Sequence, residues 1–140
     1  FCGTTEDIYP QMIRDEVPIF GYLHDGYWKD MGNRKNYLQV NSDALNNKVS
    51  LKGMPAKKIT SSFISPPILV GHNCDIAVDA KLGPHSVIGP NCRIKSGALV
   101  ENSILWEGVT IGIGSTVKNS VIVQNKTIGD YKSIKNESIT

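Results

Sequence analysis

A six-residue repeat between Ile64 and Ile134 constrains the fold of this chain more than any other feature. The first residue of every repeat is aliphatic, although Ile, Leu and Val together make up only a quarter of the sequence. Such a period is typical of solenoids, in which each unit is stable only when it is stacked on its neighbours. The first positions are Ile64, Val70, Ile76, Leu82, Ile88, Ile94, Val100, Leu105, Ile111, Val117, Ile122, Ile128 and Ile134.

The second and fifth positions of the repeat are restricted as well. The second is often glycine, which we attribute to a corner that needs backbone freedom. The fifth is usually small, as a tight interior requires. The glycines are Gly71, Gly83, Gly89, Gly112 and Gly129, and the small residues are Cys74, Ala80, Ser86, Cys92, Ala98 and Ser115.

Two steps of five residues, which begin at Val100 and Val117, give the length of one coil. Two steps of six separate them, so three steps form one coil and the rod is a triangular prism. We expect short strands of successive coils to pair in parallel, about 4.8 Å apart. The predicted columns are Val70, Ile88, Leu105 and Ile122; Ile76, Ile94, Ile111 and Ile128; and Leu82, Val100, Val117 and Ile134.

The residues before the rod read as two helices separated by a hairpin. The first helix is predicted over Thr5–Asp15 with Thr5 as its cap, and the second over Asn33–Leu45 with Asn33 as its cap. Between them, Val17–Leu23 and Tyr27–Met31 read as two strands joined by a turn. We divide the chain into residues 1–47, a polar linker over 48–63, and the rod over 64–140.

Composition excludes several classes of partner. The formal charge of +2 gives no strong field for nucleic acid or an anionic membrane, and no apolar run is long enough to span a bilayer. The first residues lack the features of a signal peptide, so we expect a cytoplasmic protein. Because the chain starts at Phe1 rather than Met, we also expect it to be a piece of a longer polypeptide.

The three cysteines show no metal-binding spacing. Cys74 and Cys92 occupy the same repeat position three steps apart, so they should be neighbours in adjacent coils. Their separation would permit a disulfide, but we favour two buried free thiols.

Two motifs ahead of the rod point to a known family. Residues 26–32 read Gly-Tyr-Trp-Lys-Asp-Met-Gly, and residues 6–10 read Glu-Asp-Ile-Tyr-Pro. Both resemble the end of the catalytic domain of sugar-1-phosphate nucleotidyltransferases, also called NDP-sugar pyrophosphorylases. In that family a Trp-x-Asp-x-Gly strand precedes Thr-Pro and a helix; here Asn33 and Arg34 replace Thr-Pro. The rod resembles the hexapeptide-repeat family, whose members form left-handed parallel β-helices.

The resemblance implies a mainly β fold, a left-handed β-helix preceded by a small α/β remnant of a catalytic domain. It also implies an enzyme that makes an NDP-sugar and pyrophosphate from a nucleoside triphosphate and a sugar-1-phosphate. The candidate pairs are mannose-1-phosphate with GTP, and glucose-1-phosphate with dTTP or ATP. Asp30 matches the family's Asp that helps hold Mg²⁺, a cation that prefers carboxylate oxygen. The phosphate-binding loop and the other metal Asp would precede this piece, which we therefore expect to be inactive alone.

An alternative function is acyl transfer from acetyl-coenzyme A, which many hexapeptide-repeat enzymes catalyse with a histidine base at a coil edge. His72 and His85 lie at corner positions of the repeat and should face solvent. The rod lacks the long protruding loop that usually accompanies such sites, so we rank this reading second.

Two kinds of residue on the rod suggest further roles. Its outward apolar side chains suggest self-association, and a row of asparagines suggests a ladder between coils. Outward apolar side chains favour a homo-oligomer formed through the β-helix, which serves assembly or regulation. Asparagines recur once per coil at one corner and read as a structural ladder, because Asn tolerates left-handed backbone. The outward apolar residues are Leu69, Val87, Leu99, Trp106 and Ile113, and the asparagines are Asn102, Asn119 and Asn136.

Overall fold

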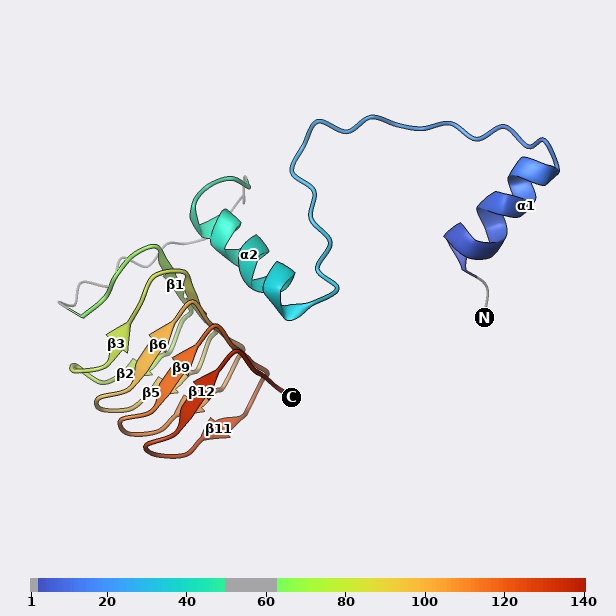
Figure 1. Cartoon of the computed structure of the whole chain (residues 1–140). Helices are drawn as coiled ribbons and strands as arrows, with labels where there is room; N and C mark the ends of the chain where they lie inside the picture. The colour runs from blue at the N-terminus through green and yellow to red at the C-terminus, as the bar shows by residue number, and fades with distance from the viewer. Residues whose placement is uncertain (1–2, 50–62) are drawn as a thin grey trace.

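The computed structural model describes residues 3–49 and 63–140. Within these residues, three helices precede the rod and thirteen short strands form it (Figure 1). The helices are η1 (Thr4–Ile8), a π-helical stretch, α1 (Tyr9–Arg14) and α2 (Arg34–Leu45). The strands are β1 (Ile68–Val70), β2 (Asp75–Ile76), β3 (Lys81–Leu82), β4 (Ser86–Ile88), β5 (Arg93–Ile94), β6 (Leu99–Glu101), β7 (Ile104–Leu105), β8 (Thr110–Ile111), β9 (Thr116–Lys118), β10 (Val121–Ile122), β11 (Thr127–Ile128), β12 (Ser133–Lys135) and β13 (Ser138–Ile139).

The strands form three parallel sheets, one for each face of the predicted prism. Their orders are β1-β4-β7-β10-β13, β2-β5-β8-β11 and β3-β6-β9-β12, so each strand pairs with the strand one coil away. All three predicted columns are confirmed by the register of these pairs. The first column continues to Ile139, and an isolated bridge adds Ile64 to the third.

The interior of the rod is filled by the first- and fifth-position side chains. Ile88, Ile111 and Val117 are at most 1% exposed. The steps of five residues add serines to this core: Ser103 Oγ donates to Glu101 O and accepts the amide of Ser120 from the next coil. A hydroxyl thus satisfies a buried backbone group where the shorter step leaves less room for apolar atoms.

The second-position glycines have a different cause from the one that the sequence suggested. Among the described glycines, positive φ angles occur at Gly97, Gly108 and Gly114 but not at the second-position glycines. At Gly71 and Gly89 a Cβ atom would instead lie 2.6 Å and 2.7 Å from the backbone of the adjacent coil. These glycines allow close coil stacking rather than an unusual backbone conformation.

The N-terminal residues confirm the two helices but not the hairpin. Both strands predicted over Val17–Leu23 and Tyr27–Met31 are wrong, because residues 17–33 contain no strand. An isolated two-stranded hairpin is at best marginally stable in water, and Pro18 cannot donate to a ladder. Thr5 does not cap the first helix, which begins one residue earlier after Gly3.

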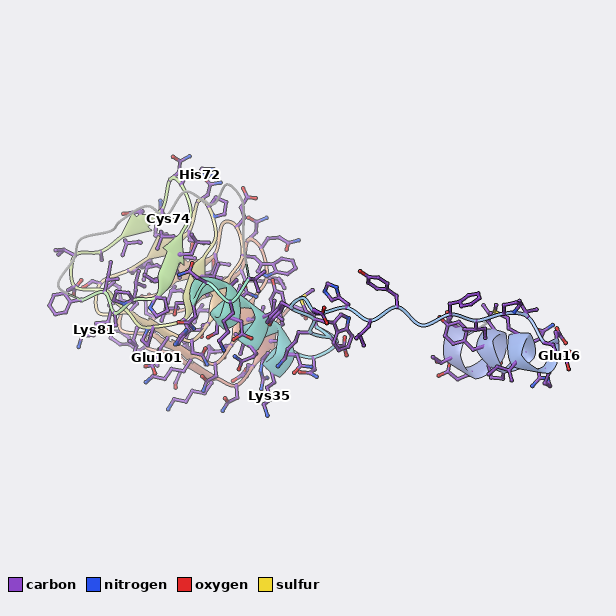
Figure 2. All side chains as sticks on the ribbon, turned by 90° about the horizontal axis from the view of Figure 1, so that it is seen from above. Glu16, Lys35, His72, Cys74, Lys81 and Glu101 are labelled. Atoms are coloured by element: carbon purple, nitrogen blue, oxygen red, sulfur yellow. The ribbon has the colours of Figure 1, made fainter. Side chains whose placement is uncertain are left out.

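The placement of α2 against the rod connects these residues to the solenoid. Side chains of α2 line grooves together with residues of β1, β4 and β7. Helix α1 lies apart from the rod at the end of the extended segment (Figures 1 and 2). The predicted linker falls mostly on residues 50–62, which lie outside the described residues.

Candidate functional site at the junction of the helix and the rod

Helix α2 begins as the sequence predicted. Asn33 is its N-cap, and its side-chain oxygen accepts the amide of Asn36 at 2.9 Å. This bond satisfies one of the free amides of the first turn. The missing helix-initiating proline therefore does not prevent a defined helix start.

Two polar contacts join α2 to the rod. Ser42 Oγ lies 2.9 Å from Nδ1 of His85, and the Arg34 guanidinium donates to the backbone oxygen of Asn136. The first contact is made one coil from the start of the rod and the second at its last coil. Helix α2 therefore runs along the rod and is held near both of its own ends.

A buried carboxylate joins α2 to the extended segment before it. Asp43 is 6% exposed and accepts hydrogen bonds from Tyr27 Oη at 2.9 Å, Gln39 Nε2 at 3.0 Å and Lys48 Nζ at 2.9 Å. The bonds from Lys48 and Tyr27 lower the pKa of Asp43 to about 2. Desolvation, followed by the bond to Asp43, raises the pKa of Tyr27. A buried charge is costly without partners, and these three hydrogen bonds offset that cost for Asp43.

Asp43 and Tyr27 are not among the site residues that the sequence predicted. The available signal was an acidic residue inside α2 four positions after Gln39. Such spacing places Gln39 and Asp43 one turn apart, where their side chains meet. Nothing local in the sequence, however, indicates that Tyr27 reaches this carboxylate.

An open groove of about 630 Å³ lies between α2 and the asparagine ladder. Arg34, Lys35 and Gln39 contribute from the helix. The rod contributes Glu101 and the three ladder asparagines, of which Asn102 donates to Asn119 at 2.8 Å. Lys35 and Glu101 lie on this side of the molecule (Figure 2).

Asp30 lies in the extended segment, three residues after Tyr27. One of its oxygens, Oδ1, accepts the amide of Gly32 at 3.0 Å, and its side chain is exposed. A carboxylate of this kind suits Mg²⁺, but a metal site needs further ligands. Among the described residues, no group of three or more His, Cys, Asp or Glu side chains could hold a metal ion.

The two candidate acyltransfer histidines lie at different corners. His72 follows β1 and is exposed (Figure 2), whereas His85 precedes β4. His85 is only half-buried, because Ser42 of α2 contacts its ring, so it faces solvent less than the sequence suggested. The structure therefore does not bring the two imidazoles into one site.

The predicted interface residues do not share one face. Leu69 and Val87 are half-buried and line a groove beside α2. Trp106, 41% exposed, follows β7, while Leu99 belongs to β6 of another sheet and Ile113 follows β8. A helix of the same chain therefore covers part of the surface that the sequence left uncovered.

Cys74 and Cys92 are adjacent in neighbouring coils and are free thiols, as predicted, but only Cys92 is buried and Cys74 is half-buried. Cys92 is buried, and its thiol donates to the carbonyl oxygen of Trp106 at 3.1 Å. Burial raises the pKa of the Cys92 thiol to about 11. Cys2 lies outside the described residues.

Architecture and repeat together define a hexapeptide-repeat parallel β-helix with a helix docked along one face. In the part of the chain that is described, no helix is both long and apolar enough to cross a bilayer. The family model described as "GMPPB C-terminal domain" matches residues 64–140, and the chain belongs to this family.

Curated relatives extend the similarity to residues before the rod. A glucose-1-phosphate adenylyltransferase of Clostridium botulinum (strain Eklund 17B / Type B) is 32% identical over 109 residues. The enzymes of that name from Clostridioides difficile (strain 630) and Geobacillus stearothermophilus are 32% and 28% identical over the same length. Each match covers 76% of this chain, and the chain spans about a quarter of the length of these relatives, 26%.

Proposed function

We propose that the chain is the C-terminal portion of a sugar-1-phosphate nucleotidyltransferase. The observation that carries this proposal is the extent of the match to the adenylyltransferases. It covers 76% of the chain, which is more than residues 64–140 can supply, so it includes residues ahead of the rod. A match to the repeat alone would be shared with hexapeptide-repeat proteins of many activities.

The reaction joins a nucleoside triphosphate to a sugar-1-phosphate and releases pyrophosphate. The names of the relatives favour glucose-1-phosphate and ATP as the first pair to assay, followed by mannose-1-phosphate with GTP and glucose-1-phosphate with dTTP. Mg²⁺ supplies charge neutralisation at the transferring phosphate. Asp30 would offer it one carboxylate, and the remaining ligands would come from the rest of the enzyme.

The rod and α2 would act as the structural base of this enzyme. Helix α2 holds Tyr27 through Asp43 and contacts the rod through His85. Acyl transfer is the less favoured alternative, because the relatives are adenylyltransferases and Ser42 of α2 contacts the His85 ring.

Substitution of Asp30 in the intact enzyme tests the proposal. We expect Asp30→Asn to reduce turnover by about a hundredfold or more, because it removes a charged ligand from the metal. Asp25→Asn is the matched control, since Asp25 is an exposed carboxylate of the same extended segment. The measurement is pyrophosphate release with each substrate pair. Normal turnover of Asp30→Asn would remove this residue from the metal site.

A further inference from the structure

The extended segment over residues 18–32 has one hydrogen-bonded tie to the rest of the described chain. That tie is the bond from Tyr27 Oη to Asp43 Oδ2 at 2.9 Å. Most side chains of the segment are exposed, including Tyr22 at 90% and Trp28 at 79%, whereas Tyr27 is 39% exposed. The only residue of the segment that this hydrogen bond holds, Tyr27, therefore lies directly before the Trp-x-Asp-x-Gly motif.

The hydrogen bonds of Asp43 leave one of its oxygens available to the Tyr27 hydroxyl. Its second oxygen, Oδ1, accepts both Gln39 and Lys48, so Oδ2 remains free for the Tyr27 hydroxyl. A carboxylate that accepts three hydrogen bonds is restrained in its rotation. An exposed Asp on a helix surface would need none of these partners.

Helix α2, which carries Asp43, is itself bonded to the rod. Ser42, the neighbour of Asp43, contacts His85 at 2.9 Å, and Arg34 bonds to Asn136. A continuous path of contacts therefore runs from the solenoid through α2 and Asp43 to Tyr27. Asp30 follows Tyr27 by three residues, a distance of about 10 Å in extended chain.

We propose that Asp43 is a positioning residue, which fixes Tyr27 and thereby sets the location of Asp30 relative to the rod. This role rests on the proposed function, since it concerns the carboxylate offered to Mg²⁺. Asp43 touches neither substrate nor metal in this role. It acts only through the Tyr27 hydroxyl.

The tether is tested on this chain by NMR relaxation of its backbone amides. We expect the ¹H–¹⁵N heteronuclear NOE of residues 26–32 to exceed that of residues 18–24, because only the former lie beside the tie. Tyr27→Phe, which removes one hydroxyl, should lower it to the level of residues 18–24. Asp43→Leu should do the same. Lys48→Gln is the control, because it leaves the Tyr27–Asp43 bond in place. An unchanged NOE in Tyr27→Phe would refute the tether.

The consequence for Asp30 is tested in the intact enzyme. Tyr27→Phe should raise the Mg²⁺ concentration for half-maximal rate about fivefold, as the loss of one ordinary hydrogen bond would. Turnover at saturating Mg²⁺ should change less than about twofold. An unchanged Mg²⁺ requirement, with the NOE lowered, would refute the positioning role. An enzyme that forms no nucleotide sugar would refute only the proposed function, since the NOE does not depend on catalysis.

Discussion

Single residues in this chain are constrained mainly by the distance between coils. The second-position glycines illustrate this, because a Cβ at Gly89 would lie 2.7 Å from the carbonyl carbon of Trp106. Backbone atoms of the next coil cannot move away without breaking the ladder. In the last coil, by contrast, a Cβ at Gly129 would meet its nearest atom, in Lys132, only at 4.0 Å.

The stability of glycine variants should follow this difference. We expect Gly89→Ala to lower the free energy of unfolding by about 1–3 kcal/mol, the usual cost of overpacking. Gly129→Ala, the control, should change it by less than about 0.5 kcal/mol. Urea unfolding monitored by circular dichroism measures both. Equal stability of the two variants would mean that close contact between coils does not require glycine at position 89.

Cys92 should make the rod sensitive to alkaline pH. Its folded-state pKa of about 11 lies above the ordinary value of 9.0, so folding favours the protonated thiol. This contribution to stability is complete below pH 9 and is lost as the pH rises through 11. We therefore expect the midpoint of urea unfolding to fall between pH 9 and 11. Cys92→Ala should weaken that fall, and no effect of Cys92→Ala would contradict the prediction.

At the level of elements, the asparagine ladder closes one corner of the rod. Asn102, Asn119 and Asn136 all have positive φ, at 44°, 50° and 57°. The side chains of the first two are joined by a hydrogen bond of 2.8 Å. The sequence interpretation of a structural ladder is thus confirmed for this pair, and it also lines the groove beside α2.

Two substitutions at Asn119 separate backbone strain from the lost hydrogen bond. Asn119→Gly should cost only the bond to Asn102, about 1 kcal/mol. Asn119→Ala should cost about 1 kcal/mol more, because alanine is strained at positive φ. Thermal unfolding of both variants against the parent chain gives the comparison. If the alanine variant were as stable as the glycine variant, the corner would not require a left-handed residue.

For the whole molecule, we propose self-association through the surface around Trp106, at the edge of α2. Trp106 is 41% exposed beside a groove that Tyr37 and Val87 also line. An aromatic side chain at the edge of such a groove is typical of protein interfaces. Leu69 and Val87 offer less open surface than the sequence suggested, since both are half-buried and line a groove with α2.

Light scattering tests this proposal. We expect the chain to have a mass above the 15.3 kDa of one copy, and Trp106→Glu to convert it to a monomer, because a buried charge opposes association. Val78→Glu serves as the control, since Val78 is 86% exposed at another corner. A parent chain that scatters as a monomer at micromolar concentration would refute the proposal.

The sequence by itself determined the rod. Each column of aliphatic side chains could be read from a local period, because the contact between coils recurs at every third step of the repeat and fixes the register. Tyr27, Asp43 and His85 obey no such period, and the sequence left their roles open. Only the tertiary structure placed α2 on the first sheet, covered His85, and joined Tyr27 to Asp43. These contacts join surfaces with no repeated pattern, so their energies depend on shapes and partners that exist only after the rod has formed.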